Sequence, residues 1–438
     1  MTLLRDEAPR ATSLNRGGNA QRRIAVLSVH TSPLAAAGGR ETGGMNVYVR
    51  ELSRELGARG YAVDVFTRRT SPQAPEVQPF GPNARVINIT AGPPELIEKD
   101  AIVAHLAEFE SNLLAFTAGE GVAYDLVHSH YWMSGWAGER LAARWGVRHV
   151  AMFHTLGEVK NRARITEHET LARIDAERVV ATSADAIVVA SDHERSLLTS
   201  LYAADASRVH IVPCGVDLDL FVPADKDEAR RRLRLGDSER IILFVGRIEP
   251  LKGIDVLIGA AAQLHEDENF RVLIVGGDAR AEAEVAQLTA LAERLGVGHH
   301  ISFVGAVEHD ELPLYYNAAD VCVVPSYYES FGMVAIESMA CGTPVVASRV
   351  GGLASTISDG ETGYLISWRC PEPFAERLEL LLDNDELRAS FGRAAREAVE
   401  RFRWANVAEA VSALYDELLA PPGTASGIPA DLRRNHEA

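Results

Sequence analysis

Two glutamates separated by an apolar stretch are the residues of this chain whose types and spacing point most directly to chemistry. Glu329 lies in a predicted loop after the apolar strand 321–325, and Glu337 lies in the helix that follows, before a second apolar strand at 344–347. A loop that leads into a helix presents unpaired backbone N–H groups, which bind anions. A carboxylate beside them can accept hydrogen bonds from sugar hydroxyls. The segment can therefore hold both halves of a nucleotide-sugar.

Paired carboxylates can also serve as the general acid and base of a glycosidase. Glu337 lies about two helical turns beyond Glu329, and much of the stretch between them is predicted loop. We therefore interpret the two glutamates as separate acceptors, one for a transferred sugar and one for a ribose.

A second loop, 245–253, carries two cations after the apolar strand 241–245. Arg247 and Lys252 flank a turn that contains Pro250. Arginine can bind phosphate oxygens bidentately, whereas lysine acts as a point charge. The net charge of the chain is −17, so an isolated pair of cations at a strand end favours an anion site over two solvated surface residues.

Glycine-rich loops follow two other strands, at 38–46 and 275–278. The first contains Gly43 and Gly44 and leads through Asn46 into a helix, so its backbone can approach an anionic ligand closely. The second is small and neutral, which suits a flat base. Neither loop has the Gly-x-Gly-x-x-Gly spacing of a dinucleotide site or the Lys-Ser/Thr of a P-loop, and ordinary turns remain the alternative.

His154 and Thr155 close the predicted strand 150–154 and face the same edge of the sheet as these loops. A lone histidine is often structural, but its position among the other loops favours a functional role. The Asp217-Leu218-Asp219 motif resembles a metal site of another class of sugar transferase. It follows a Pro-Cys-Gly turn, and we interpret it as an interdomain loop. No His/Cys cluster suggests zinc, and the prediction is that catalysis needs no metal.

Composition narrows the class of protein. Hydrophobic residues make up 47% of the 438 residues and charged residues 24%, which is ordinary globular usage. The acidic balance argues against nucleic acid as a partner. No apolar run reaches the about 20 residues that span a bilayer, and the first 20 residues lack a secretory apolar region. Four cysteines without metal spacing fit a reduced, cytoplasmic protein.

Strands and helices alternate along the chain, which predicts parallel sheets covered by helices. Predicted strands occupy 23–30, 62–67, 84–89, 126–130, 150–154, 186–189 and 208–212, and then 241–245, 271–275, 301–304, 321–325 and 345–348. Ligands of such sheets bind beyond the carboxyl ends of the strands. We therefore expect two doubly wound α/β domains that face each other across a cleft. The expected division is a tail at 1–20, an N-terminal domain at 21–218, a linker at 219–240, a C-terminal domain at 241–404, a last helix at 405–420 and a tail at 421–438.

Together these residues resemble the retaining glycosyltransferases of family 4, which have the GT-B fold with two Rossmann-like domains. The resemblance spans about residues 22–420. It rests on Glu329…Glu337 with Ser-Phe-Gly between, on Gly-Arg-Ile-x-Pro-x-Lys-Gly at 246–253, and on the segments 43–49 and 154–161. The last two are similar to the subgroup that contains the inositol-phosphate N-acetylglucosaminyltransferase of mycothiol synthesis and bacterial sucrose-phosphate synthases.

The resemblance implies a role for each candidate residue. Arg247 and Lys252 bind the donor diphosphate, Gly43 and Gly44 lie against it, and Glu337 binds the ribose. Glu329 and the backbone of Phe331, Gly332 and Met333 bind the donor sugar. His154 touches the C6 hydroxyl of that sugar at the reacting centre, so the implied catalytic set is His154, Arg247, Lys252 and Glu329. The acceptor and its phosphate are bound by Asn46, Lys99, Tyr131, Thr155 and Arg173. The last helix, 405–419, crosses back to the N-terminal domain.

No carboxylate is adjacent to His154 on its strand, so the family's front-face displacement is expected rather than a covalent intermediate. The implied co-substrate is a nucleotide-sugar, UDP-GlcNAc or UDP-glucose, and the implied acceptor resembles inositol 3-phosphate or fructose 6-phosphate. A lipid-linked or cell-envelope acceptor is the alternative within this class. Alternatives outside it are a non-catalytic nucleotide-sugar-binding module and an NAD enzyme, which the glycine spacing disfavours. A homodimer is compatible with the subgroup.

Overall fold

The computed structural model describes residues 21–35, 43–163, 169–236, 238–264, 269–277, 281–367 and 370–421. Several sequence predictions lie outside the described residues. They are the N-terminal tail, nearly all of the C-terminal tail, Gly38–Thr42 of the first glycine loop, Asp278 of the third loop, and the charged stretch 164–168.

The N-terminal domain is built on an eight-stranded sheet in the order β3-β4-β2-β1-β5-β6-β7-β8, in which only β3 is antiparallel to its neighbour. Its strands are β1 (Arg23–Leu27), β2 (Ala62–Arg68), β3 (Val77–Gly81), β4 (Ala84–Ile89), β5 (Leu126–His130), β6 (Arg148–Met152), β7 (Ala186–Val189) and β8 (Val209–Ile211). Its helices are α1 (Gly44–Ala58), η1 (Lys99–His105), α2 (Leu106–Glu120), α3 (Trp132–Trp145), α4 (Gly157–Ala163), α5 (Leu171–Ser183), α6 (Asp192–Tyr202) and η2 (Ala206–Arg208).

The C-terminal domain has a six-stranded, fully parallel sheet in the order β11-β10-β9-β12-β13-β14. Its strands are β9 (Arg240–Val245), β10 (Phe270–Val275), β11 (Ile301–Gly305), β12 (Val321–Val324), β13 (Val345–Ser348) and β14 (Gly363–Ile366). The helices on it are α7 (Lys226–Leu233), η3 (Pro250–Lys252), α8 (Ile254–Ala261), α9 (Glu282–Arg294), η5 (Gly298–His300), α10 (Leu312–Ala318), α11 (Met333–Ala340), α12 (Leu353–Thr356), α13 (Pro371–Leu382), α14 (Asp385–Ala398) and η6 (Val399–Phe402).

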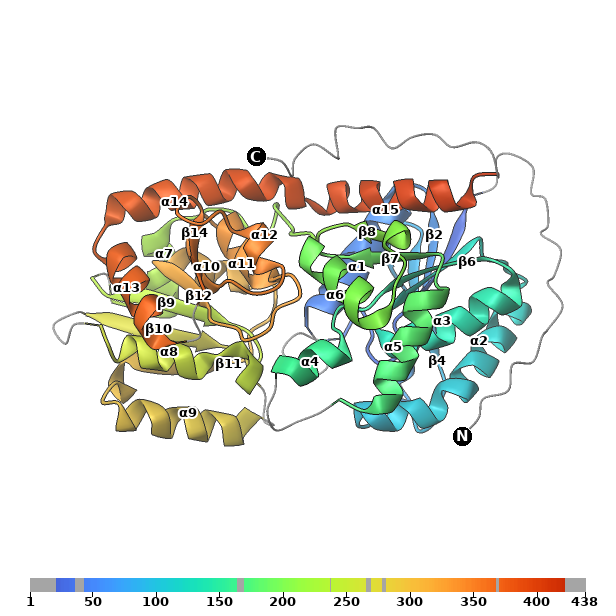
Figure 1. The fold of residues 1–438 in the computed structure, drawn as a ribbon, viewed down its shortest axis with the longest axis horizontal. Helices are drawn as coiled ribbons and strands as arrows, with labels where there is room; N and C mark the ends of the chain where they lie inside the picture. The colour runs from blue at the N-terminus through green and yellow to red at the C-terminus, as the bar shows by residue number, and fades with distance from the viewer. Residues whose placement is uncertain are drawn as a thin grey trace.

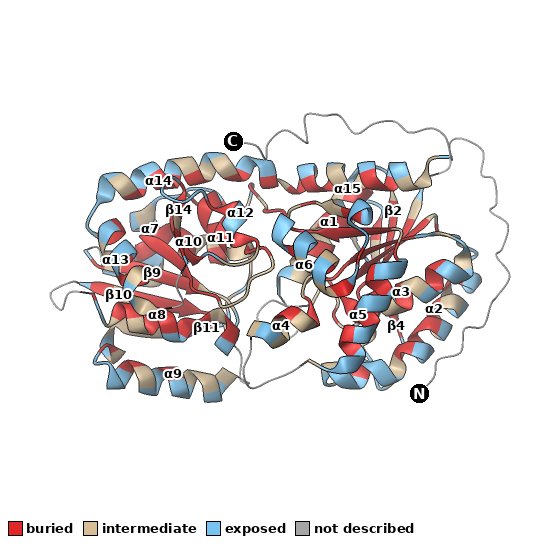
Figure 2. Ribbon diagram, viewed as in Figure 1, coloured by how far each residue is buried: buried red, intermediate tan, exposed pale blue. Residues whose placement is uncertain are grey.

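The predicted fold class, two doubly wound parallel-sheet domains, is confirmed, and Figure 1 shows the two lobes side by side. Figure 2 shows that the central strands of each lobe are buried between helices. Most of their residues are apolar, which made the strands predictable from sequence, although β5 also buries His128, Ser129 and His130. Two strands were not predicted. The edge strand β3 has no buried residue and contains Pro79, and β14 is a four-residue edge strand that begins at Gly363.

The segment expected as a linker contains helix α7, which packs on α10 of the C-terminal domain. Lys226 and Arg230 of this helix form ion pairs of 2.6 and 2.7 Å with the buried Asp320. A polar, arginine-rich sequence therefore conceals a helix that is held by charge rather than by an apolar face. The domain limits themselves stay predictions.

The last helix, α15 (Trp404–Leu419), leaves the C-terminal domain and lies on the N-terminal one, beside α1 (Figure 1). The hydroxyl of its Tyr415 lies 2.6 Å from Nδ1 of His128 on β5. At the point where the chain crosses, the N–H of Val216 donates to the carbonyl of Phe402. One apolar cluster includes Tyr48 of α1, Trp404 of α15 and Phe331 of the C-terminal domain, so the core is continuous between the two lobes.

Candidate active site

The loops after β9 and β12 lie side by side because these strands are neighbours in the sheet. The N–H of Tyr327 donates to the carbonyl of Leu251 at 2.9 Å, which ties one loop to the other. Gly253 has a φ of +68°, and a β-carbon there would lie 2.1 Å from the carbonyl oxygen of Pro325. Only glycine allows this approach, so the sequence itself fixes the contact between the loop of Lys252 and the loop of Glu329.

Lys252 and Glu329, two predicted donor-binding residues, meet across these loops. Nζ of Lys252 lies 2.7 Å from Oε2 of Glu329, and both side chains remain 19% exposed. Arg247 instead pairs with Glu249 at 3.0 Å, and its side chain is half exposed. Lysine and arginine thus lie in one loop and pair with different carboxylates.

Helix α11 follows the loop of Glu329, as expected. It begins after Gly332, whose φ of +94° lets the chain turn sharply into the helix. The first N–H groups of a helix have no acceptor within it, so those near Met333 are available at this edge. Glu337, five residues into the helix, accepts from Tyr316 at 2.9 Å and lies 3.1 Å from Nε2 of His309. A carboxylate has about four acceptor positions, so these two contacts leave others for a ligand, and the ribose role of Glu337 stays a prediction.

Residues of the two domains meet at the cleft between these loops and the N-terminal sheet. A β-carbon added to Gly44 would lie 2.9 Å from Sδ of Met333, so these two predicted donor residues face each other directly. The hydroxyl of Ser330 donates to the carbonyl of His154 at 2.5 Å. The loop that carries Glu329 is therefore joined to the residue predicted to lie at the reacting centre.

His154 occupies a strained turn rather than the end of a strand. The prediction of a strand through 154 was wrong by two residues, because β6 ends at Met152 and His154 has a φ of +60°. The N–H of Thr155 donates to the carbonyl of Phe153 at 2.7 Å, which closes a three-residue turn around it. Left-handed backbone costs a non-glycine residue roughly 1–2 kcal/mol, and such strain clusters at functional sites.

The imidazole of His154 is held by other aromatic side chains. Its Nε2 lies 3.0 Å from Nδ1 of His130, and its ring meets that of Tyr48 edge-on. Desolvation lowers the pKa of His154 to about 3, although part of the residue stays accessible. At neutral pH the ring is therefore uncharged, and it can orient a sugar hydroxyl but not serve as a cationic acid.

The four residues predicted to bind the acceptor phosphate lie together in the N-terminal domain. Nζ of Lys99 lies 5.8 Å above the ring of Tyr131, and the guanidinium of Arg173 lies 5.0 Å from the same ring. Arg173 also donates to the hydroxyls of Tyr131 and Thr155, each at 3.0 Å. Tyr131, like His154, has a positive φ (+76°).

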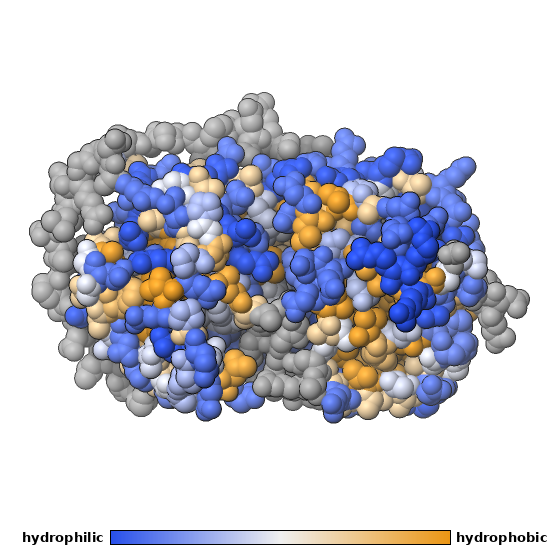
Figure 3. All heavy atoms as spheres, turned by 180° about the vertical axis from the view of Figure 1, so that it is seen from behind, coloured by the Kyte–Doolittle hydropathy of each residue, from blue (hydrophilic) through white to orange (hydrophobic). Residues whose placement is uncertain are grey.

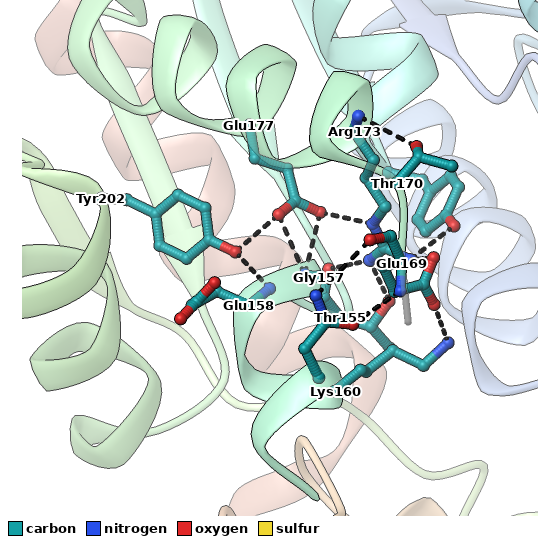
Figure 4. A network of polar contacts seen from close by, with 11 residues as sticks. Thr155, Gly157, Glu158, Lys160, Glu169, Thr170, Arg173, Glu177 and Tyr202 are labelled. Atoms are coloured by element: carbon teal, nitrogen blue, oxygen red, sulfur yellow. Dashed lines mark hydrogen bonds and ion pairs between the residues drawn. The ribbon is translucent and has the colours of Figure 1, made fainter. Parts of the chain in front are cut away.

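Sequence reasoning missed the carboxylates that organise this cluster, which Figure 4 shows. Arg173 is buried and forms ion pairs with Glu177 at 2.7 Å and with Glu169 at 3.0 Å. Glu177 also accepts from the hydroxyl of Tyr202 and from the N–H of Gly157. Lys160 lies 2.6 Å from Glu169. The four-residue spacing of Glu169, Arg173 and Glu177 was the available signal, because side chains four positions apart in or beside a helix can meet.

Asn46 has a different environment from the one predicted. Its amide nitrogen donates to Thr31 at 2.6 Å and to the carbonyl of Ser32 at 2.7 Å, and its oxygen accepts from the N–H of Gly43. It is buried and ties the start of α1 to the loop after β1. The binding roles assigned to Asn46 and to the other site residues stay predictions.

The Asp217-Leu218-Asp219 motif forms a turn in the structure. Oδ1 of Asp217 accepts from the N–H groups of Asp219 and Leu220, and Asp219 pairs with Arg403. Across the described ranges there is no group of three or more His, Cys, Asp or Glu residues arranged to hold a metal ion.

The described helices include none that is long and apolar enough to cross a membrane. The face in Figure 3 mixes many hydrophilic residues with smaller apolar patches on both lobes.

Known proteins were compared with the whole chain. A family model described as Glycosyltransferase Family 4 matches residues 42–220, and one described as Glycosyl transferases group 1 matches 225–398. D-inositol 3-phosphate glycosyltransferase 2 of Catenulispora acidiphila is 45% identical over 403 residues, which cover 90% of this chain and 94% of that protein. The D-inositol 3-phosphate glycosyltransferase of Mycolicibacterium smegmatis is 42% identical, covering 91% and 92%.

Solved structures agree with these matches. Sucrose-phosphate synthase from Thermosynechococcus elongatus has a TM-score of 0.84 and 37% identity, covering 91% of this chain and 99% of that one. Anabaena HepE, solved with UDP and glucose, has a TM-score of 0.72 at 19% identity, which shows the common fold. The structure therefore has the GT-B fold of glycosyltransferases. Two doubly wound domains face each other, and the last helix crosses from one to the other. The chain belongs to glycosyltransferase family 4, in the group that contains the enzymes named D-inositol 3-phosphate glycosyltransferase.

Proposed function

We propose that this enzyme transfers a hexosyl group from a UDP-sugar, UDP-GlcNAc or UDP-glucose, to a hydroxyl of a small phosphorylated polyol, with inositol 3-phosphate as the first candidate. One observation carries the proposal. Lys99, Tyr131, Thr155 and Arg173 gather into one cationic cluster, and Thr155 is the residue next to His154. A phosphate bound there places the rest of the acceptor beside the cleft.

The proposed displacement retains the anomeric configuration and proceeds on one face of the donor sugar. Lys252, Arg247 and the start of α11 stabilise negative charge as it develops on the leaving diphosphate. As the bond between the anomeric carbon and the diphosphate breaks, a diphosphate oxygen accepts the proton of the acceptor hydroxyl. The bond between the anomeric carbon and the acceptor oxygen then forms on the same face of the sugar. The enzyme contributes positioning and charge, so the same cations take the part that a divalent metal has in other transferases.

The acceptor assignment favours inositol 3-phosphate over fructose 6-phosphate. Proteins named for the first acceptor are 40–45% identical to this chain, whereas the sucrose-phosphate synthase is 37% identical.

A panel assay tests the proposal. UDP-, ADP- and GDP-linked sugars are each combined with inositol 3-phosphate, fructose 6-phosphate, inositol and fructose, and nucleotide release is measured with and without EDTA. We expect turnover with a UDP-sugar and inositol 3-phosphate, unchanged by EDTA, and an α-linked product by NMR. Equal turnover with unphosphorylated inositol would contradict the assignment of the phosphate cluster, and loss of activity in EDTA would contradict the metal-free mechanism.

A further inference from the structure

The guanidinium of Arg173 already has partners within the protein on each of its three nitrogens. Nε donates to Glu177, Nη1 donates to the hydroxyl of Tyr131, and Nη2 donates to the carbonyl and the hydroxyl of Thr155. Nη1 also forms an ion pair with Glu169. A phosphate that reaches Arg173 must therefore replace one of these acceptors.

Of the two carboxylates that pair with Arg173, Glu177 is buried and has further partners, whereas Glu169 is partly exposed. Glu177 is fully buried and also accepts from Gly157 and Tyr202. Glu169 precedes the N-cap of α5, and its side chain is 17% exposed. Its backbone is anchored separately, because its N–H donates to Oδ1 of Asn161 at 2.6 Å. Rotation of its side chain can thus release Arg173 without moving the helix.

The carboxylate of Glu169 lies where cations converge from three elements, as Figure 4 shows for two of them. Nζ of Lys160 on α4 is 2.6 Å away and Nη1 of Arg173 on α5 is 3.0 Å away. Burial alone would raise the pKa of Glu169, but the charges of Arg173, Lys160 and Lys99 lower it to about 2. The carboxylate of Glu169 is therefore an anion of the protein itself that these cations already bind.

Charge balance indicates what replaces it. Lys99, Lys160 and Arg173 supply three positive charges, and Glu177 and Glu169 remove two. If a phosphate dianion enters while Glu169 remains, the cluster becomes negative. If Glu169 leaves, the three cations balance Glu177 and the phosphate. A buried cluster favours the neutral arrangement, because an uncompensated charge there is costly.

We infer that the carboxylate of Glu169 occupies the seat of the acceptor's phosphate, and that Lys160 is a further ligand of that phosphate once Glu169 has moved away. This inference rests on the proposed function and deepens it. Glu169 acts as a specificity residue, because a neutral polyol has no charge with which to displace it. Lys160 changes partner, from the carboxylate to the phosphate.

The test measures phosphate binding separately from catalysis. Calorimetry gives the Kd of inorganic phosphate and of inositol 3-phosphate for the full chain, and kinetics give KM and kcat. Glu169→Gln keeps the size of the side chain but removes its charge, so we expect about three- to tenfold tighter binding of both ligands, since the seat is no longer occupied by a competitor. Lys160→Met should weaken both by about tenfold or more and leave the Kd of UDP unchanged.

Asp175→Asn is the matched control, because Asp175 is an exposed carboxylate on the same helix and pairs with Arg178. It should leave both Kd values unchanged. If Glu169→Gln weakens phosphate binding, Glu169 merely orients Arg173 and the inference is wrong. If the variants behave as expected but the wild type transfers no sugar to any phosphorylated acceptor, the inference stands and the proposed function fails.

Discussion

At the scale of single residues, the ion pair between Lys252 and Glu329 is the main contact of the predicted donor-binding site. Their side chains pair at 2.7 Å, yet both remain accessible from the cleft. In the proposed mechanism, Lys252 stabilises the charge of the leaving diphosphate. Because removal of one such group costs about 10²–10³ in rate, we expect Lys252→Ala to lower kcat by that factor. Steady-state kinetics with the UDP-sugar would measure it.

A lysine elsewhere in the same domain provides the control. Lys226 also forms a short ion pair, with the buried Asp320, but it lies on α7 among structural contacts. Lys226→Ala should lower the unfolding midpoint and leave kcat of the folded enzyme unchanged. Lys252→Ala should lower kcat and leave the unfolding midpoint unchanged. Activity of Lys252→Ala within a few-fold of wild type would show that its assignment is wrong.

At the scale of elements, glycines decide how closely the loops approach. Gly253 has a φ of +68° and faces the carbonyl of Pro325, 2.1 Å from where a β-carbon would lie. Gly253→Ala must therefore push the Lys252 loop away from the Glu329 loop. We expect a loss of stability well above the roughly 1 kcal/mol of left-handed backbone alone, together with a loss of kcat. Urea unfolding and kinetics would measure the two effects.

Gly296 has the same left-handed backbone as Gly253 but lies in open surroundings. Its φ is +78°, and nothing lies within 4 Å of the position of an added β-carbon. Gly296→Ala should cost about 1 kcal/mol and leave kcat unchanged. Equal effects of the two substitutions would mean that backbone strain, and not the contact between loops, governs Gly253.

At the scale of the whole molecule, buried histidines in the N-terminal domain make folding sensitive to acid. Burial lowers the pKa of His30 and His128 to about 3 and that of His149 to about 4. In the unfolded chain a histidine has a pKa near 6.5. Below that pH the unfolded state binds more protons, so the free energy of unfolding falls as pH drops from about 6.5 to 4, by up to about 1.4 kcal/mol per histidine per pH unit.

Urea unfolding at pH 7, 6 and 5 would measure this slope. His149→Asn should reduce the slope by about one proton, because one group that gains a proton on unfolding is removed. His193→Asn, at an exposed position on α6, should not change it. A free energy of unfolding that is constant between pH 7 and pH 5 would contradict the prediction.

The sequence determined the two-domain fold and the loops of the donor side, because these are local patterns. An apolar run predicts a buried strand, and a glycine or a cation directly after it lies at the carboxyl end of a parallel sheet. Polar or short elements, such as α7 and β14, carry too weak an apolar pattern to be found in this way.

Only the tertiary structure decided which partner each charged side chain takes. Ser330 reaches the carbonyl of His154 although 176 positions separate them, and Tyr415 reaches His128 across 287. Arg173 was predicted as a phosphate ligand, and the structure adds partners that spacing did not reveal: it donates to Tyr131 and to the carbonyl and hydroxyl of Thr155. Local propensity fixes where a strand or helix forms. The choice among several ion-pair and hydrogen-bond partners depends on packing between distant segments, and spacing indicates it only for pairs close in sequence, such as Arg173 and Glu177.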